Sequence, residues 1–483
     1  MARLEIPSER RALYDRLILL LFVLLAPFGL SNAREMFDDG DVSWHIATGR
    51  WILAHGIPST DPFSHTMPGH PWVAHEWVPD LLYASAFNLA GYPGVAALVG
   101  LALLALFAIL ALPLRRQAAA PALVIALLAM VIVLAPFTLA RPHVLVWPLV
   151  AGWTVMLLHY RDSGRAPPLA FALLMTLWTN MHGSFPLGLV IAGGIALDAL
   201  INAGWDRRLL IRWLVFGVAS GLAALLNANG VAGITYPFAT LGMESLPSIE
   251  EWKPSNPTDT PYFYAALLAV LGLALYRGVK LGLGELLLLL FLLAMAFSQV
   301  RHQTWLAIVA ALILPPRLAG RRRGEDANTP DLPARTVAAG LTAAALLLVA
   351  GRLLLPVVPA DNRFAPRTAL AHIPPELRSR PVFNEYSFGG PLILAGIRPY
   401  IDGRADMYGD RFFRDYQEAL RGDPEHFDKA VDRYGIEWTM LPPHITLARR
   451  LDRTPGWKRV YADKVAVIHV RRSNNDSGRS SYE

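Results

Sequence analysis

The chain has 483 residues, of which 54% are apolar (AVILMFWYC) and 17% are charged, well below the roughly 25% charged residues of soluble domains. Cysteine is absent, which excludes disulfides, thiolate metal sites and cysteine nucleophiles. The net charge of +6 does not call for a nucleic-acid partner, because basic residues on the cytoplasmic loops of a membrane protein give the same sum.

Repeated apolar runs predict a polytopic α-helical membrane protein. Runs of about 20 nearly uncharged residues can cross a hydrocarbon core of ~30 Å as helices. We expect about 11 such transmembrane helices within residues 1–359. They lie near residues 17–30, 95–114, 121–140, 143–159, 167–181, 184–203, 209–227, 262–277, 281–299, 303–317 and 334–357. A partly embedded helix over residues 80–90 precedes the second span, and the glycines and proline of 91–94 interrupt the chain between them.

Arginines predict the orientation of the spans. Basic residues precede the first span and recur on alternate loops: Arg115–Arg116, Arg161 with Arg165, Arg207–Arg208 with Arg212, Arg277 with Lys280, and Arg317 with residues 321–323. Because positive charge collects on the cytoplasmic side, we expect a cytoplasmic N-terminus. The first outer loop, residues 32–78, and everything after about residue 359 are then expected outside.

The C-terminal part differs in composition from the apolar part and predicts a small α/β domain over residues 360–475. Alternating patterns predict strands at 381–384, 398–402, 436–441 and 465–470. Amphipathic patterns predict helices at 412–420, 424–434 and 445–451. Residues 476–483 are polar and are expected to form a disordered tail.

The first outer loop holds the most unusual polar sequence of the chain. Residues 41–53 suit a helix lying along the membrane interface, with four side chains on one face: Asp41, Trp44, His45 and Thr48. Charges so near a bilayer are costly unless they are hydrated, paired or used in chemistry. Asp38, Asp39 and Asp41 are therefore either candidate catalytic carboxylates or an Asp-rich turn that caps the interfacial helix.

Further polar residues collect at the predicted outer ends of the spans. They are Arg141, His143, Asn180, His182, Glu251, Lys253, Arg301 and His302, with His75 and Glu76 at the end of the first outer loop. A phosphate would explain outer arginines, since guanidinium binds phosphate through two hydrogen bonds. Each arginine could instead cap helix-end carbonyls or extend to the interface. His182 could likewise only hydrogen-bond neighbouring helix ends.

Histidines crowd the first outer loop and raise the question of a metal. They are His45, His55, His65, His70 and His75. Their spacing matches a ligand pattern only weakly, through Asp41 with His45 on one helical turn and His75 beside Glu76. A divalent metal cofactor therefore stays open, and the alternative is a set of solvated loop histidines.

Together these features resemble the GT-C class of membrane glycosyltransferases, and in particular a set of uncharacterised bacterial membrane proteins grouped with it. The similarity rests on the long N-terminal membrane domain, the acidic first loop and the outer C-terminal domain. Its short motifs are Asp39-Gly-Asp41-Val-Ser-Trp44-His45, Gly56-Ile-Pro-Ser-Thr-Asp61-Pro-Phe-Ser64, His75-Glu76-Trp77, Asn180-Met-His182-Gly183 and Ile401-Asp402-Gly403-Arg404. A more distant similarity is to the protein mannosyltransferases and lipid A aminoarabinose transferases, whose first loop carries an acidic motif, a following aromatic and a closing glycine. Asp41, Trp44 and Gly56 stand in comparable places.

The resemblance implies an inverting transferase of the bacterial inner (plasma) membrane with a periplasmic C-terminal domain. Such an enzyme moves a hexosyl or pentosyl group from a polyprenyl-phosphate donor to an extracytoplasmic lipid, glycan or protein. An Asp-Glu pair of better-known members is replaced here by Asp-Gly-Asp, so the base is Asp41 or, second, Asp39. Phosphate-binding candidates are Arg141, Arg301 and His302. Candidates for the sugar and acceptor pocket are His45, His75, Glu76, His143, Asn180, His182, Glu251 and Lys253.

Two other functions remain open at this point. A lipid-linked glycan transporter or flippase would need polar residues at mid-membrane and often repeated halves, whereas the polar residues here gather at one face and no repeat at a fixed period is present. The other is a non-catalytic scaffold of envelope glycan assembly. The turns at Gly389-Gly390 and at 402–404 are either strand-end turns with an Asp–Arg pair or part of an acceptor surface.

Overall fold

The computed structural model describes residues 23, 25–31, 34–114, 120–318, 334–357 and 359–472. The predictions for the basic residues before residue 23, for Arg115–Arg116, for 321–323 and for the tail at 476–483 fall outside these residues.

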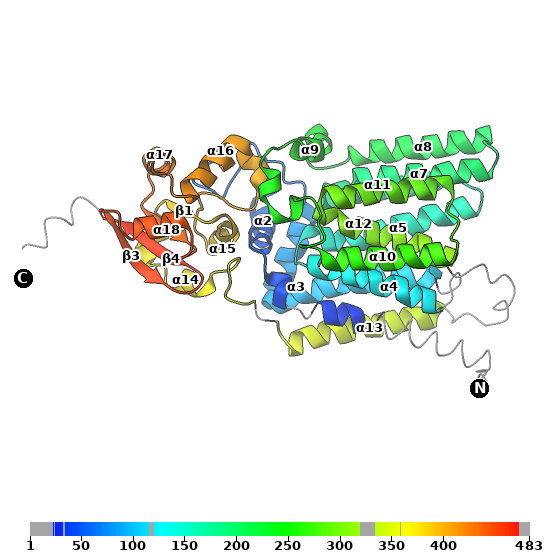
Figure 1. Ribbon diagram of the computed structural model, residues 1–483, viewed down its shortest axis with the longest axis horizontal. Coiled ribbons are helices and arrows are strands. Elements are labelled where there is room, and N and C mark those ends of the chain that lie inside the picture. The colour runs from blue at the N-terminus through cyan, green and yellow to red at the C-terminus, as the bar shows by residue number, and fades with distance from the viewer. Residues whose placement is uncertain are drawn as a thin grey trace, which may run out of the picture.

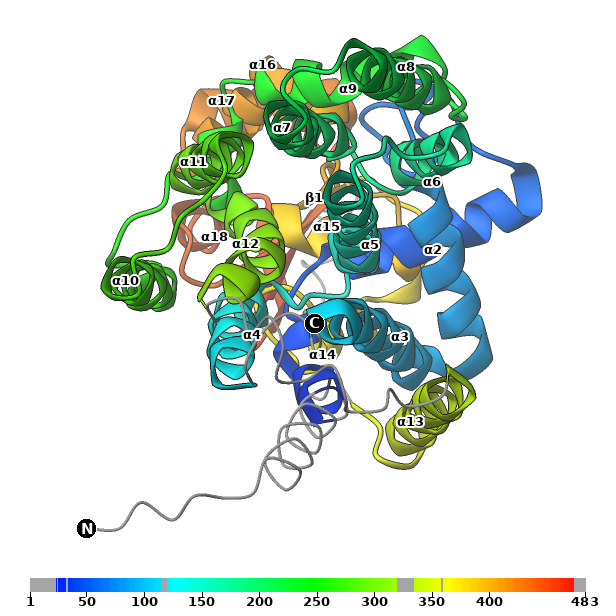
Figure 2. The same ribbon diagram turned by 90° about the vertical axis from the view of Figure 1, so that its right-hand side faces the viewer.

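A bundle of apolar helices makes up one end of the molecule, and the helices run side by side (Figures 1 and 2). They are α3 (Trp77–Leu114), α4 (Ala120–Leu134), α5 (Pro142–Asp162), α6 (Leu173–Met181), α7 (Pro186–Asn202), α8 (Arg207–Ala224), α10 (Pro261–Tyr276), α11 (Leu283–Ser298), α12 (Gln303–Leu318) and α13 (Ala334–Leu354). Among the described residues, three helices are long and apolar enough to cross a membrane by themselves: Trp77–Ala111, Pro142–Asp162 and Ala334–Leu354. With the shorter apolar helices beside them, they make the chain an integral membrane protein.

The helix predicted over residues 41–53 is present as α2 (Asp41–His55), which packs against the first part of α3. The predicted embedded helix and the second span form one continuous element, α3, with a kink between them. At the kink Gly91 has φ 61°, in the left-handed region that glycine adopts without the steric cost of a side chain. Because of the kink, the first part of α3 packs against α2 and the second part runs within the helix bundle.

A small mixed sheet lies at the other end of the molecule (Figure 1). Its strand order is β1-β2-β4-β3, formed by β1 (Val382–Asn384), β2 (Trp438–Leu441), β4 (Val467–Arg471) and β3 (Trp457–Ala462). Strands β1 and β2 are parallel, and the other two pairs are antiparallel. The helices around the sheet are α14 (Arg367–Ala371), α15 (Gly389–Leu394), α16 (Ala405–Leu420), α17 (Pro424–Tyr434) and α18 (Thr446–Leu451).

One predicted strand is absent, and one observed strand was not predicted. The segment 398–402 forms no strand, because its carbonyls bond to the first loop: Pro399 accepts from the His65 N–H at 3.1 Å and Tyr400 from the Thr66 hydroxyl at 2.7 Å. Strand β3 was missed because it is an edge strand with mostly exposed side chains, so it lacks the alternating pattern of a half-buried strand.

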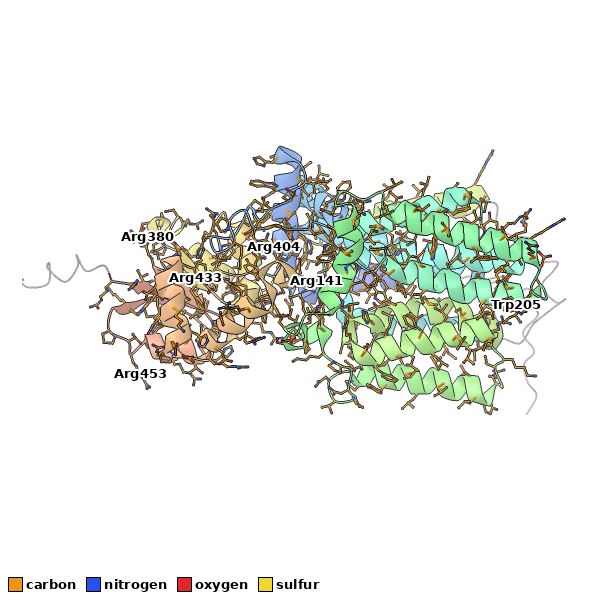
Figure 3. The ribbon with its side chains drawn as sticks, turned by 90° about the horizontal axis from the view of Figure 1, so that it is seen from above. Arg141, Trp205, Arg380, Arg404, Arg433 and Arg453 are labelled. Carbon is orange, nitrogen blue, oxygen red and sulfur yellow. The ribbon has the colours of Figure 1, made fainter. Side chains whose placement is uncertain are left out.

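A buried ion pair joins the first loop to the C-terminal domain. The guanidinium of Arg404 donates two hydrogen bonds of 2.7 Å to Asp402 and one of 2.8 Å to Asp61 of the first loop. The Tyr408 hydroxyl donates to Asp402 as well, at 2.7 Å. Of the two alternatives for this turn, the Asp–Arg pair is therefore present, although no strand precedes it, and Asp61 extends the pair across the boundary between the two parts. Figure 3 shows Arg404 on the side of the domain that faces the bundle.

We expect Arg404→Gln to lower the free energy of unfolding by about 3–5 kcal/mol, because it leaves two buried carboxylates without their cation. Thermal unfolding of the detergent-purified protein, together with limited proteolysis, measures the loss. Arg380→Gln is the matched control: its pair with Glu437 is about half exposed (46% and 45%), so its loss should cost less than about 1 kcal/mol. Equal unfolding temperatures for the two variants would contradict the assignment.

Candidate active site

A cavity of about 410 Å³ lies where the helix bundle meets the C-terminal domain. Ten of the predicted site residues line it: Asp41, His45, His75, Glu76, Arg141, His143, His182, Glu251, Arg301 and His302. They come from α2, from helix ends and from the connecting segments at one end of the bundle. Figure 3 shows Arg141 at this junction and Trp205 at the opposite end of the helices.

Three predicted site residues do not line the cavity. Lys253 is exposed. The Asn180 amide is occupied within the protein: its oxygen accepts from the Trp77 indole at 2.7 Å, and its NH₂ donates to the Thr176 carbonyl within α6 and to the Leu226 carbonyl just after α8. Asn180 therefore fixes the start of α3, next to Glu76, by joining three helix ends. Asp39 is covered by Arg141, and its side chain is 6% exposed.

Arg141 is held by three carboxylates. Asp39 receives two of its hydrogen bonds, from Nε and from Nη2. Asp41 Oδ2 lies 2.7 Å from Nη2, and Glu251 Oε2 lies 2.5 Å from Nη1. Asp39 Oδ1 also accepts the backbone N–H of Asp41 at 2.9 Å, so it supports the start of α2 as an Asp-rich turn would. The Asp-rich turn and the group of carboxylates around Arg141 thus share the same residues, Asp39 and Asp41.

Asp41 is the carboxylate of this group that both faces the cavity and opens α2. Its Oδ1 accepts from the Trp44 indole N–H at 3.0 Å. Burial raises its pKa, Arg141 opposes that rise, and the negative charges of Asp39 and Glu251 add to it, so the pKa stays raised. A carboxyl with a raised pKa is a stronger base than an ordinary aspartate.

Glu251 and Arg301 form the next contact along the cavity wall. Arg301 Nη1 lies 3.3 Å from Glu251 Oε1, and its guanidinium lies 4.3 Å above the ring of Trp252. Burial opposes ionisation of Glu251, but Arg141 and Arg301 lower its pKa to about 2. Glu251 therefore stays ionised and connects the two guanidinium groups. Among the described residues, Arg301 has one carboxylate partner, whereas Arg141 has three.

A second group surrounds Glu76. Its carboxylate oxygens lie 3.6 Å from His75 Nε2, 3.6 Å from His182 Nε2 and 4.0 Å from His45 Nε2. Burial would raise the pKa of Glu76, but the three rings, His75 foremost, lower it below its usual value. Burial lowers the pKa of His45 and of His182 to about 3, so both are neutral. Burial opposes protonation of His75 as well, but Glu76 outweighs it and its pKa is raised.

His182 has a defined tautomer in this group. The Ser184 backbone N–H donates to its Nδ1 at 3.0 Å, so the ring proton sits on Nε2, toward Glu76. Nδ1 of His182 therefore bonds the start of a neighbouring helix, as the predicted alternative requires. Nε2 faces Glu76 in the cavity.

The described residues contain no group of three His, Cys, Asp or Glu side chains placed to hold a metal ion. His55 and His70 are exposed, as solvated loop histidines would be. His65 instead bonds the Val382 carbonyl of β1 at 2.9 Å.

The cavity has two further walls that sequence reasoning did not assign. One is apolar and comes from α7, α11 and α9 (Val231–Leu241). It includes Leu187, Val190, Phe238, Leu241, Phe291 and Met295. The other belongs to the C-terminal domain and includes Tyr386, Gly403, Arg404, Ala405 and Asp406. The Asp-Gly-Arg motif signalled part of this second wall, but Tyr386 and Asp406 carry no sequence signal beyond their neighbourhood.

The C-terminal domain packs directly on the Asp41 carboxylate. A Cβ at Gly403 would overlap Asp41 Oδ1 and would approach the Trp44 indole nitrogen to 2.7 Å. Only a residue without a side chain fits there, so Gly403 sets how closely the domain approaches the carboxylate.

Comparison with known proteins identifies the fold. No protein-family model matches the sequence, and no curated protein matches it significantly. Among solved structures, that of ArnT from Cupriavidus metallidurans bound to undecaprenyl phosphate aligns with 95% of this chain and 98% of that chain, with a TM-score of 0.53 and 15% sequence identity. The resemblance seen in the sequence is thus confirmed at the level of fold, over nearly the full length of both chains: the protein has the fold of ArnT, a GT-C polyprenyl-phosphate glycosyltransferase.

Proposed function

We propose that the protein is an inverting glycosyltransferase that moves a sugar from a polyprenyl-phosphate donor to an extracytoplasmic acceptor, with Asp41 as the base. One observation carries the proposal. In the fold of a protein solved with undecaprenyl phosphate, Asp41 faces a cavity that has guanidinium groups on one wall and apolar side chains on another.

The chemistry follows from these groups. An acceptor hydroxyl or amine attacks the anomeric carbon, the bond from that carbon to the phosphate oxygen breaks, and polyprenyl phosphate leaves with the electron pair. Asp41 takes the acceptor proton. The transition state resembles an oxocarbenium ion, and the anionic groups around Asp41 stabilise its positive charge.

Asp41 is favoured over Asp39 by position. Asp39 uses both oxygens within the protein, toward Arg141 and toward the backbone of Asp41, and does not line the cavity. Its role in the proposal is to hold Arg141 and the start of α2, and so to orient the base.

The donor would lie along the apolar wall with its phosphate at Arg301. Arg141 is engaged by three carboxylates, whereas Arg301 has one contact of this kind and lies against Trp252. His302 lines the same cavity. A phosphate would provide a partner for both residues.

Transport is less well supported, because the cavity and its charged groups lie at one end of the helices rather than at their middle. A scaffold would not require a carboxylate of raised pKa facing such a cavity.

Asp41→Asn should reduce product formation by about 10²- to 10⁴-fold, the usual contribution of a general base. Mass spectrometry of glycolipids and envelope glycans, in a strain that lacks the protein and carries each variant, measures it. Asp38→Asn is the matched control, since Asp38 accepts a hydrogen bond from Asn362 and does not line the cavity. If Asp41→Asn and Asp39→Asn both restore the normal glycolipid and glycan composition, whereas the strain without the protein differs, the enzyme hypothesis is rejected and the scaffold hypothesis is supported.

The pH dependence of the rate should report the environment of Asp41. A base acts when ionised, so a raised pKa moves the acid limb of kcat/KM above that of an ordinary aspartate. Glu251→Gln removes a negative charge that raises this pKa, so the limb should shift to lower pH. Glu250→Gln, next to it but exposed, should leave the limb in place. A limb that stays put in Glu251→Gln would exclude Asp41 as the titrating base.

Arg301→Gln should weaken binding of undecaprenyl phosphate by about tenfold or more, because a charged hydrogen bond to phosphate is lost. Microscale thermophoresis of the purified protein with undecaprenyl phosphate measures the change. Lys253→Gln removes a nearby positive charge outside the cavity and should bind like the wild type. The phosphate position is wrong if the two variants bind alike.

A further inference from the structure

Asp406 is a cavity residue that the proposed reaction leaves without a role. It lies in the first turn of α16, before the break in that helix at Gly409. Its side chain lines the cavity and is half-buried, and within the described part of the chain its carboxylate accepts a hydrogen bond only from its own backbone N–H. The remaining lone pairs of that carboxylate can accept hydrogen bonds from a ligand.

The turn that carries Asp406 is held in place by Arg404. Arg404, two residues earlier, is buried and bound to Asp402 and to Asp61 of the first loop. Its guanidinium also lies 4.6 Å above the ring of Trp72. The turn that carries Asp406 therefore keeps one place relative to the cavity, as a binding group requires.

Two aromatic rings line the same cavity as Asp406. His75 and Tyr236 line the cavity and stack with ring centroids 3.9 Å apart and planes 30° apart. Both rings are within electrostatic reach of Asp406: burial raises the pKa of Asp406 and the nearby His75 opposes the rise, while Asp406 adds to the raised pKa of Tyr236. A carboxylate accepts hydrogen bonds from hydroxyl groups, and aromatic rings pack against the C–H faces of a sugar ring.

Asp406 lies on a different wall of the cavity from the side chains proposed for the donor. It belongs to the C-terminal domain, whereas the apolar wall is built by α7, α9 and α11, and Arg301 contacts Glu251. Tyr236 belongs to α9, which also supplies Phe238 to the apolar wall, so the two groups meet at that helix.

We propose that Asp406, together with the stacked rings of His75 and Tyr236, binds a hydroxyl-bearing sugar unit of the acceptor. The inference rests on the proposed function and names its acceptor class: a glycan or glycolipid, rather than a plain lipid or a peptide side chain. Asp406 is a specificity-determining residue, since it holds the acceptor near Asp41 and takes no proton in the reaction.

A kinetic experiment tests the subsite. The donor is the polyprenyl-linked sugar that accumulates in the deletion strain, and the acceptor source is a membrane extract of that strain. Asp406→Asn should raise the half-saturating amount of extract about tenfold, with a smaller effect on the maximal rate. Asp41→Asn should lower the maximal rate instead. Asp415→Asn, the same change at an exposed position of α16, should match the wild type. An unaltered half-saturating amount in Asp406→Asn overturns the proposal.

A second measurement does not depend on catalysis. Carbodiimide labelling of carboxyl groups, read by peptide mass spectrometry, follows the reactivity of Asp406 directly. The deletion-strain extract, and glycans released from it, should protect Asp406, and undecaprenyl phosphate alone should not. Protection by undecaprenyl phosphate alone would assign Asp406 to the donor-binding site. Protection by delipidated peptide alone would make the acceptor a protein. Either of these results, or no protection at all, overturns the inference. Protection by glycan in a protein that transfers no sugar would reject the proposed function and leave the glycan subsite standing.

Discussion

The site depends on one guanidinium group shared by three carboxylates. Arg141 lies at the start of α5, and it bonds Asp39 and Asp41 of the first loop and Glu251 of the segment before α10. Three segments far apart in the sequence therefore meet at a single side chain. Burial raises the pKa of Asp41, and because the three carboxylates outnumber their two cations, Arg141 and Arg301, the remaining negative charge adds to the rise. Removing Arg141 would leave buried charges unpaired, so its structural role cannot be separated from its effect on the base.

This sharing also bears on where a phosphate can bind. An arginine at the outer end of a span looks like a phosphate ligand in the sequence, and Arg141 and Arg301 looked equivalent. The structure separates them by the number of their partners. Arg141 has three carboxylates around it, and a further anion would have to displace one of them; Arg301 shares only Glu251 and keeps part of its guanidinium against Trp252. The same argument removes Asn180 from the binding residues, since its amide has protein partners on both sides.

How far the sequence predicts the molecule depends on whether the controlling interaction is local. A helix in a membrane needs a continuous apolar run, so every predicted span within the described residues coincides with a helix. The break at Gly91 was predicted because glycine and proline act on their own backbone. The segment 398–402 was mispredicted because its carbonyls bond the first loop, more than 300 residues earlier. Asp406 carried no signal at all, since an aspartate in the first turn of an amphipathic helix is ordinary and only the opposing wall makes it part of a cavity.

The C-terminal domain is part of the cavity rather than an appendage to the bundle. Gly403 lies against the Asp41 carboxylate so closely that a methyl group would displace it, and Arg404 is locked to Asp61 within the same turn. A shift of the domain by the size of one methyl group would therefore change the positions of Asp41 and Asp406 together. Because a buried ion pair resists separation unless both charges find new partners, the two parts should move as one body. The proposed base, Asp41, and the proposed acceptor-binding carboxylate, Asp406, then keep a fixed distance, as the proposed transfer requires if the acceptor is to meet the base in one orientation.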